Sequence, residues 1–399
     1  MRRVCLSQRQ ALGKDTLLKL RLNSPAGGWF PALQVLDWCI TRSHLPYADL
    51  FFSPHLRKIF LRLPLSWYLS GVPHDALPAI ASAISTLPTS ALQSLSVFSL
   101  AFWSSMTPWG DFAISLSSVV LRCGPSLKEF TSTIPLSDAA VNHLIRLPHL
   151  RTCHIEGPPP SYSASHLPLI FPPLTEFVVR ADAARGWLSL LELLGGCVAP
   201  LSKVKESLRS LRLPSPTIDA PFASLIQTFR NLANLNIDRS CYPRGGEGQC
   251  IFKLNNDHVT ELAVALPRLE LLVLGRPCFD NTCTTTVACL LSISVYCVKL
   301  RSLEIHFNTA NIVDDLKGIS NDLRFQELRS RPRCKLSRLD VYRIPLALNE
   351  PGFETVVNGM IDIFPSLGYC AEVVRGSGWR ELSERLRKVQ RNRGALDTS

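Results

Sequence analysis

The chain has 399 residues, of which 46% are apolar and 19% are charged. This composition excludes a disordered chain, whose low apolar content could not support a packed core. The longest apolar run, near residues 287–298, is shorter than a bilayer span and contains Ser292 and Ser294. The sequence therefore predicts no membrane-spanning segment.

The first residues, MRRVCLSQRQALGKD, are partly basic but contain no uninterrupted apolar core and no small-residue cleavage site. That pattern argues against secretion. The chain has an odd number of cysteines, 13, and several occupy apolar positions of the repeat described below, such as Cys153 and Cys370. We therefore expect buried thiols in a reducing compartment, and an intracellular protein, cytoplasmic or nuclear.

The formal net charge is +11, which raises the question of a nucleic-acid partner. Basic residues gather at 2–21, 324–343 and 375–393, and none of these stretches interleaves them with aromatics as a base-stacking surface would. A solvated rim or an acidic protein partner is the preferred interpretation. A basic nucleic-acid-associated scaffold is the alternative from another class.

A Leu-x-x-Leu-x-Leu spacing recurs along the whole chain and is clearest at Leu269, Leu272 and Leu274. This spacing is typical of a leucine-rich repeat, in which the last two positions alternate along a short strand. A Pro often stands two residues before the first leucine, as in Leu147-Pro148-His149-Leu150, where it ends a helix and presets an extended backbone. About thirteen units fit the template, and they begin at Leu17, Leu33, Leu56, Leu92, Leu127, Leu150, Leu174, Leu208, Leu232, Leu269, Leu300, Leu336 and Leu367.

Helices are predicted between these strands at 75–85, 137–146, 221–229 and 256–266, because each stretch has apolar residues on one helical face. The fold class is therefore α/β: an irregular leucine-rich-repeat solenoid, a ribonuclease-inhibitor-like horseshoe, with parallel strands on the concave face and helices outside. We expect a lead-in at 1–16, the solenoid at 17–376 with a mobile insertion at 239–249, and a capping helix and tail at 377–399. A basic membrane-surface helix is the alternative for the last segment.

The sequence predicts no enzyme and no cofactor. Gly13-Lys14 lacks the upstream glycine of a phosphate loop, and Gly376-Ser377-Gly378 lacks the frame of a nucleophile elbow. The closest group of candidate metal ligands is Cys241, Cys250, Cys278 and Cys283, whose spacing matches no zinc pattern, so no metal site is expected.

The expected function is carried by the strand residues that alternate with the core leucines, because these point away from the core and line the concave face. Their charge runs from basic through acidic to mixed, which is typical of a specific binding surface; the alternative for any one residue is an ordinary solvated side chain. The basic end at Lys19–Arg62 is expected to meet acidic groups of a protein partner. The candidate residues are Lys19, Arg21, Lys58, Phe60, Arg62, Glu129, His154, Glu156, Glu176, Arg180, Arg212, Glu304, His306, Arg338, Asp340 and Tyr342.

The Phe/Leu-Pro-x-Leu entries at 147–150, 171–174 and 266–269, with helices such as SDAAVNHLIRL, resemble the fungal F-box/leucine-rich-repeat proteins across nearly the whole chain. The resemblance implies a substrate receptor of a cullin ubiquitin ligase, in which an N-terminal F-box binds the Skp adaptor and the repeats hold the substrate. Repeats that begin near Leu17 leave no room for a three-helix F-box. We therefore expect a non-enzymatic protein-binding module that does not bind the Skp adaptor by itself.

Overall fold

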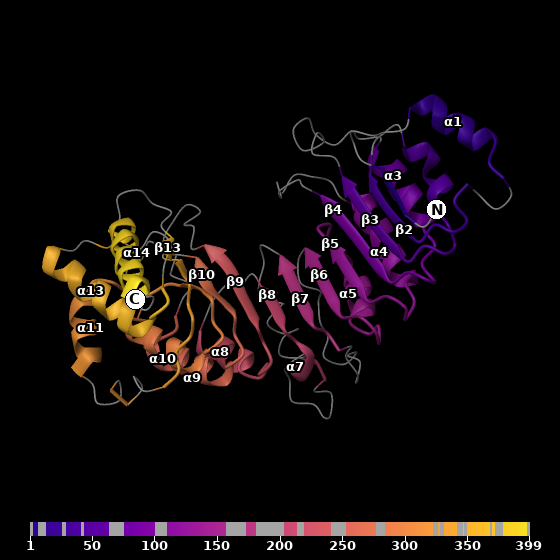
Figure 1. The fold of residues 1–399 in the computed structure, drawn as a ribbon. Helices are drawn as coiled ribbons and strands as arrows, with labels where there is room; N and C mark the ends of the chain where they lie inside the picture. The colour runs from indigo at the N-terminus through magenta and orange to yellow at the C-terminus, as the bar shows by residue number, and fades with distance from the viewer. Residues whose placement is uncertain are drawn as a thin grey trace. The chain divides into compact units, whose positions relative to one another are not determined.

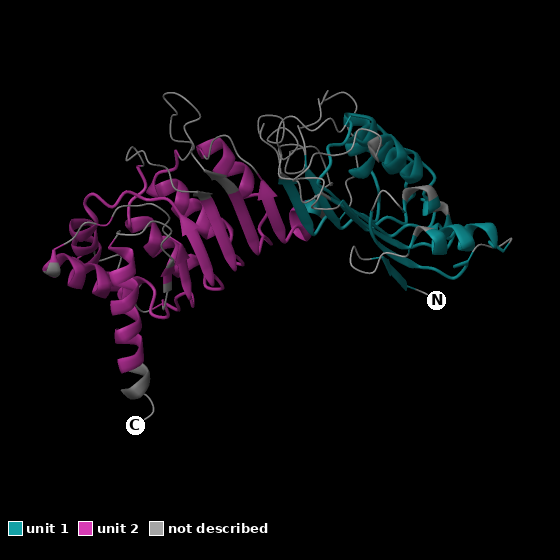
Figure 2. Ribbon diagram, turned by 90° about the horizontal axis from the view of Figure 1, so that it is seen from above, with its two compact units in different colours: residues 1–187, 198–204 teal, residues 188–197, 205–399 magenta. Residues whose placement is uncertain are grey.

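The computed structural model describes residues 3–6, 13–25, 29–40, 44–63, 76–99, 110–156, 173–180, 203–213, 219–240, 253–276, 284–321, 326–327, 331–340, 346, 349–367, 369–371 and 378–396. The chain divides into two compact units (Figure 2). Unit 1 comprises Met1–Trp187 and Val198–Val204, and unit 2 comprises Leu188–Cys197 and Lys205–Ser399.

Unit 1 consists of parallel strands that pair in sequence order, with helices packed on one side of them (Figure 1). Its elements are β1 (Arg3–Leu6), α1 (Lys14–Leu22), β2 (Val35–Cys39), the 3-10 segment η2 (Leu45–Phe51), β3 (Lys58–Leu63), α3 (Ala76–Ser85), β4 (Ser94–Ser99), α4 (Gly110–Arg122), β5 (Glu129–Ser132), α5 (Asp138–Leu144), β6 (Thr152–Glu156) and β7 (Glu176–Arg180).

Unit 2 repeats this plan. Its strands are β8 (Ser210–Leu213), β9 (Asn234–Ser240), β10 (Leu271–Arg276), β11 (Ser302–Ile305), β12 (Arg338–Asp340) and β13 (Tyr369–Ala371), again parallel and paired in sequence order. Its helices are α8 (Ala220–Ile226), α9 (Asn256–Ala265), α10 (Ala288–Tyr296), α11 (Ile312–Asn321), α13 (Glu350–Ile363) and α14 (Trp379–Leu396); α7 (Lys203–Ser207) lies where the sequence passes from unit 1 to unit 2.

The leucines of the repeat form continuous buried rows because the strand pairing keeps them in register. Leu272 of β10 pairs with Leu235 of β9 and Leu303 of β11, and all three are fully buried. In unit 1, Ile59 pairs with Leu36 and Leu95 in the same way. The residues that alternate with these leucines lie on the opposite face of each strand, where they form rows of polar side chains.

The prediction of a leucine-rich-repeat α/β solenoid is confirmed, with one correction at its start. The strand that pairs with β2 is Arg3–Leu6, inside the stretch expected to be a lead-in, whereas Leu17, Leu20 and Leu22 belong to α1. Leucines at positions 17 and 20 are also one helical turn apart, so the repeat spacing does not by itself exclude a helix. Leu17 is buried and Leu22 is 76% exposed, as expected of a helix with one apolar face.

The predicted helices at 75–85, 137–146, 221–229 and 256–266 correspond to α3, α5, α8 and α9. Ser137 and Asp219 accept hydrogen bonds from the backbone amides of Ala140 and Phe222, so each caps the first turn of its helix. Of the expected insertion at 239–249, residues 239 and 240 end β9 and the rest lies outside the described residues.

Helix α14 covers the last strand of unit 2. The Ser383 hydroxyl accepts a hydrogen bond from the Cys370 amide at 2.9 Å and donates one to the Cys370 carbonyl at 2.7 Å, so it satisfies backbone groups of β13. Trp379, Leu382 and Leu386 of this helix are fully buried. Because α14 pairs backbone groups of β13 and covers the core beside it, it protects this edge of the sheet from pairing with a strand of another molecule.

Candidate functional site

Side chains of β2–β7 that alternate with the buried rows form a face of mixed polarity, here called the unit 1 strand face. Its members are brought together by strand register: Phe60 of β3 is level with Asp37 of β2, and Thr131 of β5 is level with His154 of β6. The face comprises Asp37, Lys58, Phe60, Arg62, Ser94, Ser96, Phe98, Glu129, Thr131, Thr152, His154, Glu156, Glu176, Val178 and Arg180. Arg180 lies in β7, but its side chain is not among those described.

At the start of this face, Asp37 and Arg62 form a two-pronged ion pair. The guanidinium donates from Nε to Oδ1 at 3.1 Å and from Nη2 to Oδ1 at 2.6 Å. Asp37 is buried and Arg62 is exposed. The hydrogen bond from Arg62 to Asp37 raises the pKa of the guanidinium, so the arginine stays charged while much of its charge is offset by its neighbour.

The prediction of a basic patch of strand residues at Lys19–Arg62 is therefore wrong. Lys19 and Arg21 lie in the last turn of α1, where positive charge complements the helix dipole, and not on a strand. The Arg21 guanidinium lies 5.9 Å from the centre of the Tyr47 ring. Arg62 is paired with Asp37, whereas Lys58 of β3 has no carboxylate at hydrogen-bonding distance among the described residues.

A small cavity of about 80 Å³ lies on the unit 1 strand face where β4–β7 end. Thr131 and His154 form part of its wall, and Phe98 contributes an aromatic ring. The volume suits part of one side chain of a partner, not a whole cofactor, since cofactor sites measure about 300–1,000 Å³. The lining residues are Phe98, Thr131, Ser132, Thr133, His154, Ile155, Glu156 and Val178.

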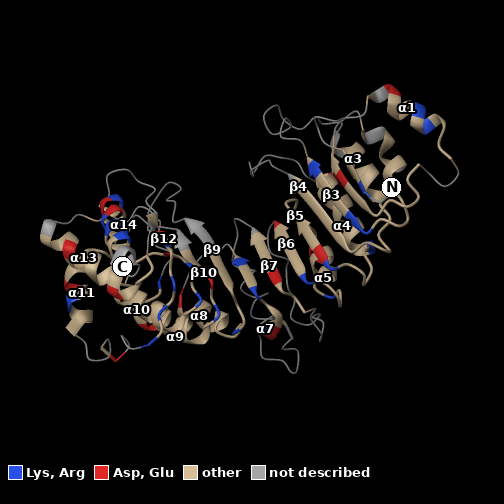
Figure 3. Cartoon of the chain, viewed as in Figure 1, with Lys and Arg blue, Asp and Glu red and all other residues tan. Residues whose placement is uncertain are grey.

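One carboxylate lines this cavity and two more lie on the same strand face. Glu156 lines it, Glu129 is exposed on β5, and Glu176 of β7 lies 3.0 Å from His154, measured from Oε1 to Nε2. The side chains of His154 and Glu176 are 30% and 39% exposed, so both can be reached from solvent. Figure 3 shows acidic residues on β5–β7 of this unit. The cavity thus combines an aromatic ring with nearby carboxylates, of which Glu156 has an interaction of its own within the chain and is level with Arg180 of β7.

Sequence reasoning placed His154, Glu156 and Glu176 on this face but missed Phe98 and Thr133. Both follow the last core position of their unit, Val97 and Ser132 respectively, and so fall outside the Leu-x-x-Leu-x-Leu template. The signal that would have found Phe98 is its repeat position, which is that of Arg62 in the preceding unit.

In unit 2 the corresponding strand residues are more enclosed. Asp340 is buried and pairs with exposed Arg338 at 2.9 Å, from Nε to Oδ2. His306 is 6% exposed, so little of its surface is accessible to a partner, while Arg212 and Glu304 are half-buried. Tyr342 lies outside the described residues.

Within the described ranges no group of three or more His, Cys, Asp or Glu side chains is arranged to hold a metal ion. The four cysteines of the closest spacing pattern fall in residues that are not described. No helix in the described part of the chain has both the length and the apolarity needed to cross a membrane.

Parallel strands in sequence order, leucine rows in register and helices on one side define the class: an α/β leucine-rich-repeat protein. No family model matches the chain, and no curated protein matches its sequence. Among solved structures, it is similar to a chain of the crystal structure of the Rad7 and Elc1 complex in yeast. The TM-score is 0.47 and the sequence identity 14%, over 94% of this chain and 82% of that chain.

Proposed function

We propose that this chain is a non-enzymatic protein-binding module and that a segment of its partner lies along the unit 1 strand face. The observation that carries the proposal is the cavity between β4 and β7, where an aromatic ring and a carboxylate, Phe98 and Glu156, line one recess. Interfaces are held by a few side chains that fill such recesses. A lysine or arginine of the partner suits this one, because its alkyl stem covers Phe98 while its charge faces Glu156.

The proposal is tested by filling the cavity. Thr131→Trp places a large ring in the recess on a half-buried position, and Thr86→Trp places the same ring on an exposed position at the end of α3. Proteins captured by the wild-type chain are identified, and the affinity of each purified candidate is measured for the three forms. We expect Thr131→Trp to weaken binding by about 10-fold or more and Thr86→Trp to leave it unchanged. Equal affinity for all three forms would show that the cavity is not part of the interface.

The charge of the partner is tested separately with Glu156→Gln, which keeps the shape of the side chain. If a basic side chain enters the cavity, this change weakens binding and reduces its dependence on salt. Unchanged affinity and salt dependence would show that the partner presents no cation there, although it could still occupy the face.

The resemblance to F-box/leucine-rich-repeat proteins supports a finer proposal, that the bound partner is a substrate for ubiquitination. Its test is the half-life of the identified partner in cells with and without this protein. A longer half-life on removal is expected, and an unchanged one contradicts the ligase role while leaving the binding role intact. By itself, the 399-residue chain is expected not to bind the Skp adaptor, and a direct binding assay with the purified adaptor checks this.

A further inference from the structure

The turns that lead into five successive strands of unit 2 each carry at least one basic residue; Arg268, Lys299 and Lys335 lie at the same place in their repeats, whereas Arg209, Arg230 and Arg301 lie one or two residues away from that place. We call the set Arg209, Arg230, Arg268, Lys299, Arg301 and Lys335 the edge ladder. All six side chains are exposed, and none has an ion-pair or hydrogen-bond partner elsewhere in the described part of the chain. Successive members are as many as 38 positions apart, from Arg230 to Arg268, and only Lys335 falls in a basic stretch of the sequence, 324–343.

Backbone hydrogen bonds hold these turns in line. The Glu270 amide donates to the Ala233 carbonyl at 2.7 Å, the Arg301 amide to the Glu270 carbonyl at 2.9 Å, and the Arg338 amide to the Arg301 carbonyl at 3.2 Å. The turns before β8, β9, β10, β11 and β12 therefore stack at the spacing of the strands themselves. At about 4.8 Å per strand, the edge ladder extends roughly 20 Å along the sheet.

Helix α14 continues the positive charge past the last of these turns. Ser383, near its start, contacts the middle of β13, whereas Gln390 donates a hydrogen bond to the Pro365 carbonyl at 2.6 Å. Pro365 belongs to the turn before β13, which is the next turn after that of Lys335 because β13 pairs with β12. The second half of α14 thus lies at the same edge of the sheet as the ladder.

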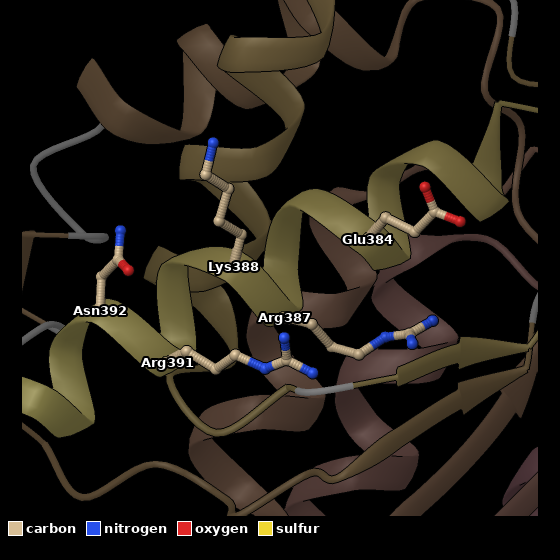
Figure 4. A pocket seen from close by; sticks show the side chains of 5 residues that line it. All are labelled: Glu384, Arg387, Lys388, Arg391 and Asn392. Atoms are coloured by element: carbon tan, nitrogen blue, oxygen red, sulfur yellow. The ribbon is translucent and has the colours of Figure 1, made fainter.

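The exposed side of α14 at this edge carries Arg387, Lys388 and Arg391, which line a surface depression of about 450 Å³ together with Glu384 and Asn392. Figure 4 shows Arg387 and Arg391 projecting from the same side of the helix, one turn apart. Glu384 is already paired with Arg380, and the three cations have no such partner in the described ranges. Complementing the negative end of a helix dipole explains only part of this charge. Arg268 and Lys299 lie two residues after the C-caps of α9 and α10, whereas Arg387 and Arg391 precede the last turn of α14.

We propose that the edge ladder, continued by Arg387 and Arg391, binds the phosphate backbone of a DNA duplex without reading its sequence. A duplex is a linear polyanion, and a linear row of unpaired cations neutralises its phosphates and releases their counterions. The ladder turns at 207–209, 230–233, 267–270, 298–301 and 335–337 contain one carboxylate, Glu270, and exposed Glu206 directly precedes the first of them, level with Arg230. These turns contain no aromatic side chain on which single-stranded bases could stack. The apolar face of α14 is buried against unit 2, so it is not available for insertion into a membrane.

The test compares two triple variants of the full chain with equal loss of charge. Arg268→Gln with Lys299→Gln and Lys335→Gln removes three cations of the ladder. Lys19→Gln with Lys253→Gln and Lys317→Gln removes three exposed lysines from α1, from the stretch before α9 and from α11. Binding to a fluorescent DNA duplex of about 20 base pairs, long enough to pass the ladder, is measured over a range of salt, and thermal unfolding of each form checks the fold. Two further variants, Arg268→Gln alone and Arg387→Gln with Arg391→Gln, serve if the triple ladder variant unfolds.

The wild-type chain is expected to bind with an affinity that falls steeply with salt. The ladder variant should lower the slope of log K against log salt by about 3, close to 0.9 for each lost phosphate contact, while the control variant keeps the wild-type slope. Absence of duplex binding at low salt, or equal loss in both triple variants, overturns the proposal. The proposal is also overturned if polyglutamate competes as strongly as the duplex, or if phosphatidylserine vesicles bind as strongly, and the ladder variant reduces that binding equally. Either result assigns this edge to another kind of partner. These outcomes do not affect the proposal for the cavity of unit 1, which Thr131→Trp tests separately.

Discussion

At the scale of single residues, burial controls the chemistry of the cysteines. The eight cysteines that the structure describes are free thiols, and most are buried in the repeat core. Burial raises the pKa of the Cys153 thiol to about 12, and the same cause raises those of Cys123, Cys297 and Cys370 to about 12. These thiols are protonated and unreactive at neutral pH, because the thiolate is the nucleophile and the metal ligand.

The raised pKa values predict a loss of stability in alkali. Below pH 9 the thiol of Cys153 is protonated in both the folded and the unfolded chain. Between pH 9 and about 12 the unfolded thiol ionises and the buried one does not, so unfolding releases a proton and becomes more favourable as pH rises. At pH 10 we expect Cys153 alone to lower the free energy of unfolding by about 1.4 kcal/mol relative to pH 8.

Urea unfolding at pH 8 and pH 10 checks this, with Cys153→Val as the matched variant. Valine fills a similar volume and does not titrate, so the variant should lose about 1.4 kcal/mol less than the wild type between the two pH values. Lysines and tyrosines also titrate in this range, but they are common to both proteins and cancel in the difference. An equal loss in both forms contradicts the assignment of Cys153 to a buried, protonated state.

Single-residue inference from the sequence was sound where alternation along a strand decided the side chain's direction, as for His154, Glu156 and Glu176. It failed for Arg62, whose charge is offset by Asp37 in the neighbouring strand, 25 residues away. A reversal of Lys58 and Arg62 to glutamate, which the sequence alone would suggest as harmless to the fold, instead sets a carboxylate beside buried Asp37. Such a pair of like charges destabilises the fold, so this double variant is not a clean test of binding.

At the scale of elements, the assignment of inward and outward positions on β10 makes a sharp prediction. Leu272 is fully buried, whereas its neighbour Leu271 lies on the opposite face and is half-buried. Leu272→Asp should lower the free energy of unfolding by about 3–5 kcal/mol, since it places an unpaired charge in the core. Leu271→Asp, the same change one residue earlier, should cost within about 1 kcal/mol.

Chemical unfolding of the two variants checks the strand register. A similar loss of stability in both would mean that the two faces of β10 do not differ as the structure shows. A larger loss for Leu271→Asp would show that the strand register is shifted by one residue, because such a shift exchanges the inward and outward side chains.

The sequence predicted the strands of twelve repeat units and the helices with clear caps because their apolar spacing matches one element only. It misplaced the first strand because Leu17, Leu20 and Leu22 satisfy the repeat spacing, although they belong to α1, in which Leu17 is buried and Leu22 is exposed. β1 is only four residues long, Arg3–Leu6, and has no leading Leu-Pro entry, so local pattern could not identify it. What identifies it is pairing with β2, a contact between residues 32 apart such as Val4 and Leu36.

At the scale of the whole chain, the two proposed binding regions belong to different units and to different surfaces of the repeat. The unit 1 strand face follows from residues that alternate with the core leucines, and the sequence could locate most of it. The cavity and the edge ladder could not be located in this way. Both arise when turns or strands 20 to 40 residues apart are stacked by the fold, and the alignment of side chains between repeats is a property of strand register, not of local sequence.

Site-specific photo-crosslinking tests whether a protein partner lies along the unit 1 strand face. The photoreactive residue p-benzoylphenylalanine replaces Phe60, which is half-buried on that face, or Ile114, which is 67% exposed on α4. Each labelled chain is mixed with the purified partner and irradiated, and covalent adducts are resolved by mass. We expect an adduct from position 60 and none from position 114. An adduct from position 114 with none from position 60 would place the partner on the helices and contradict the proposal.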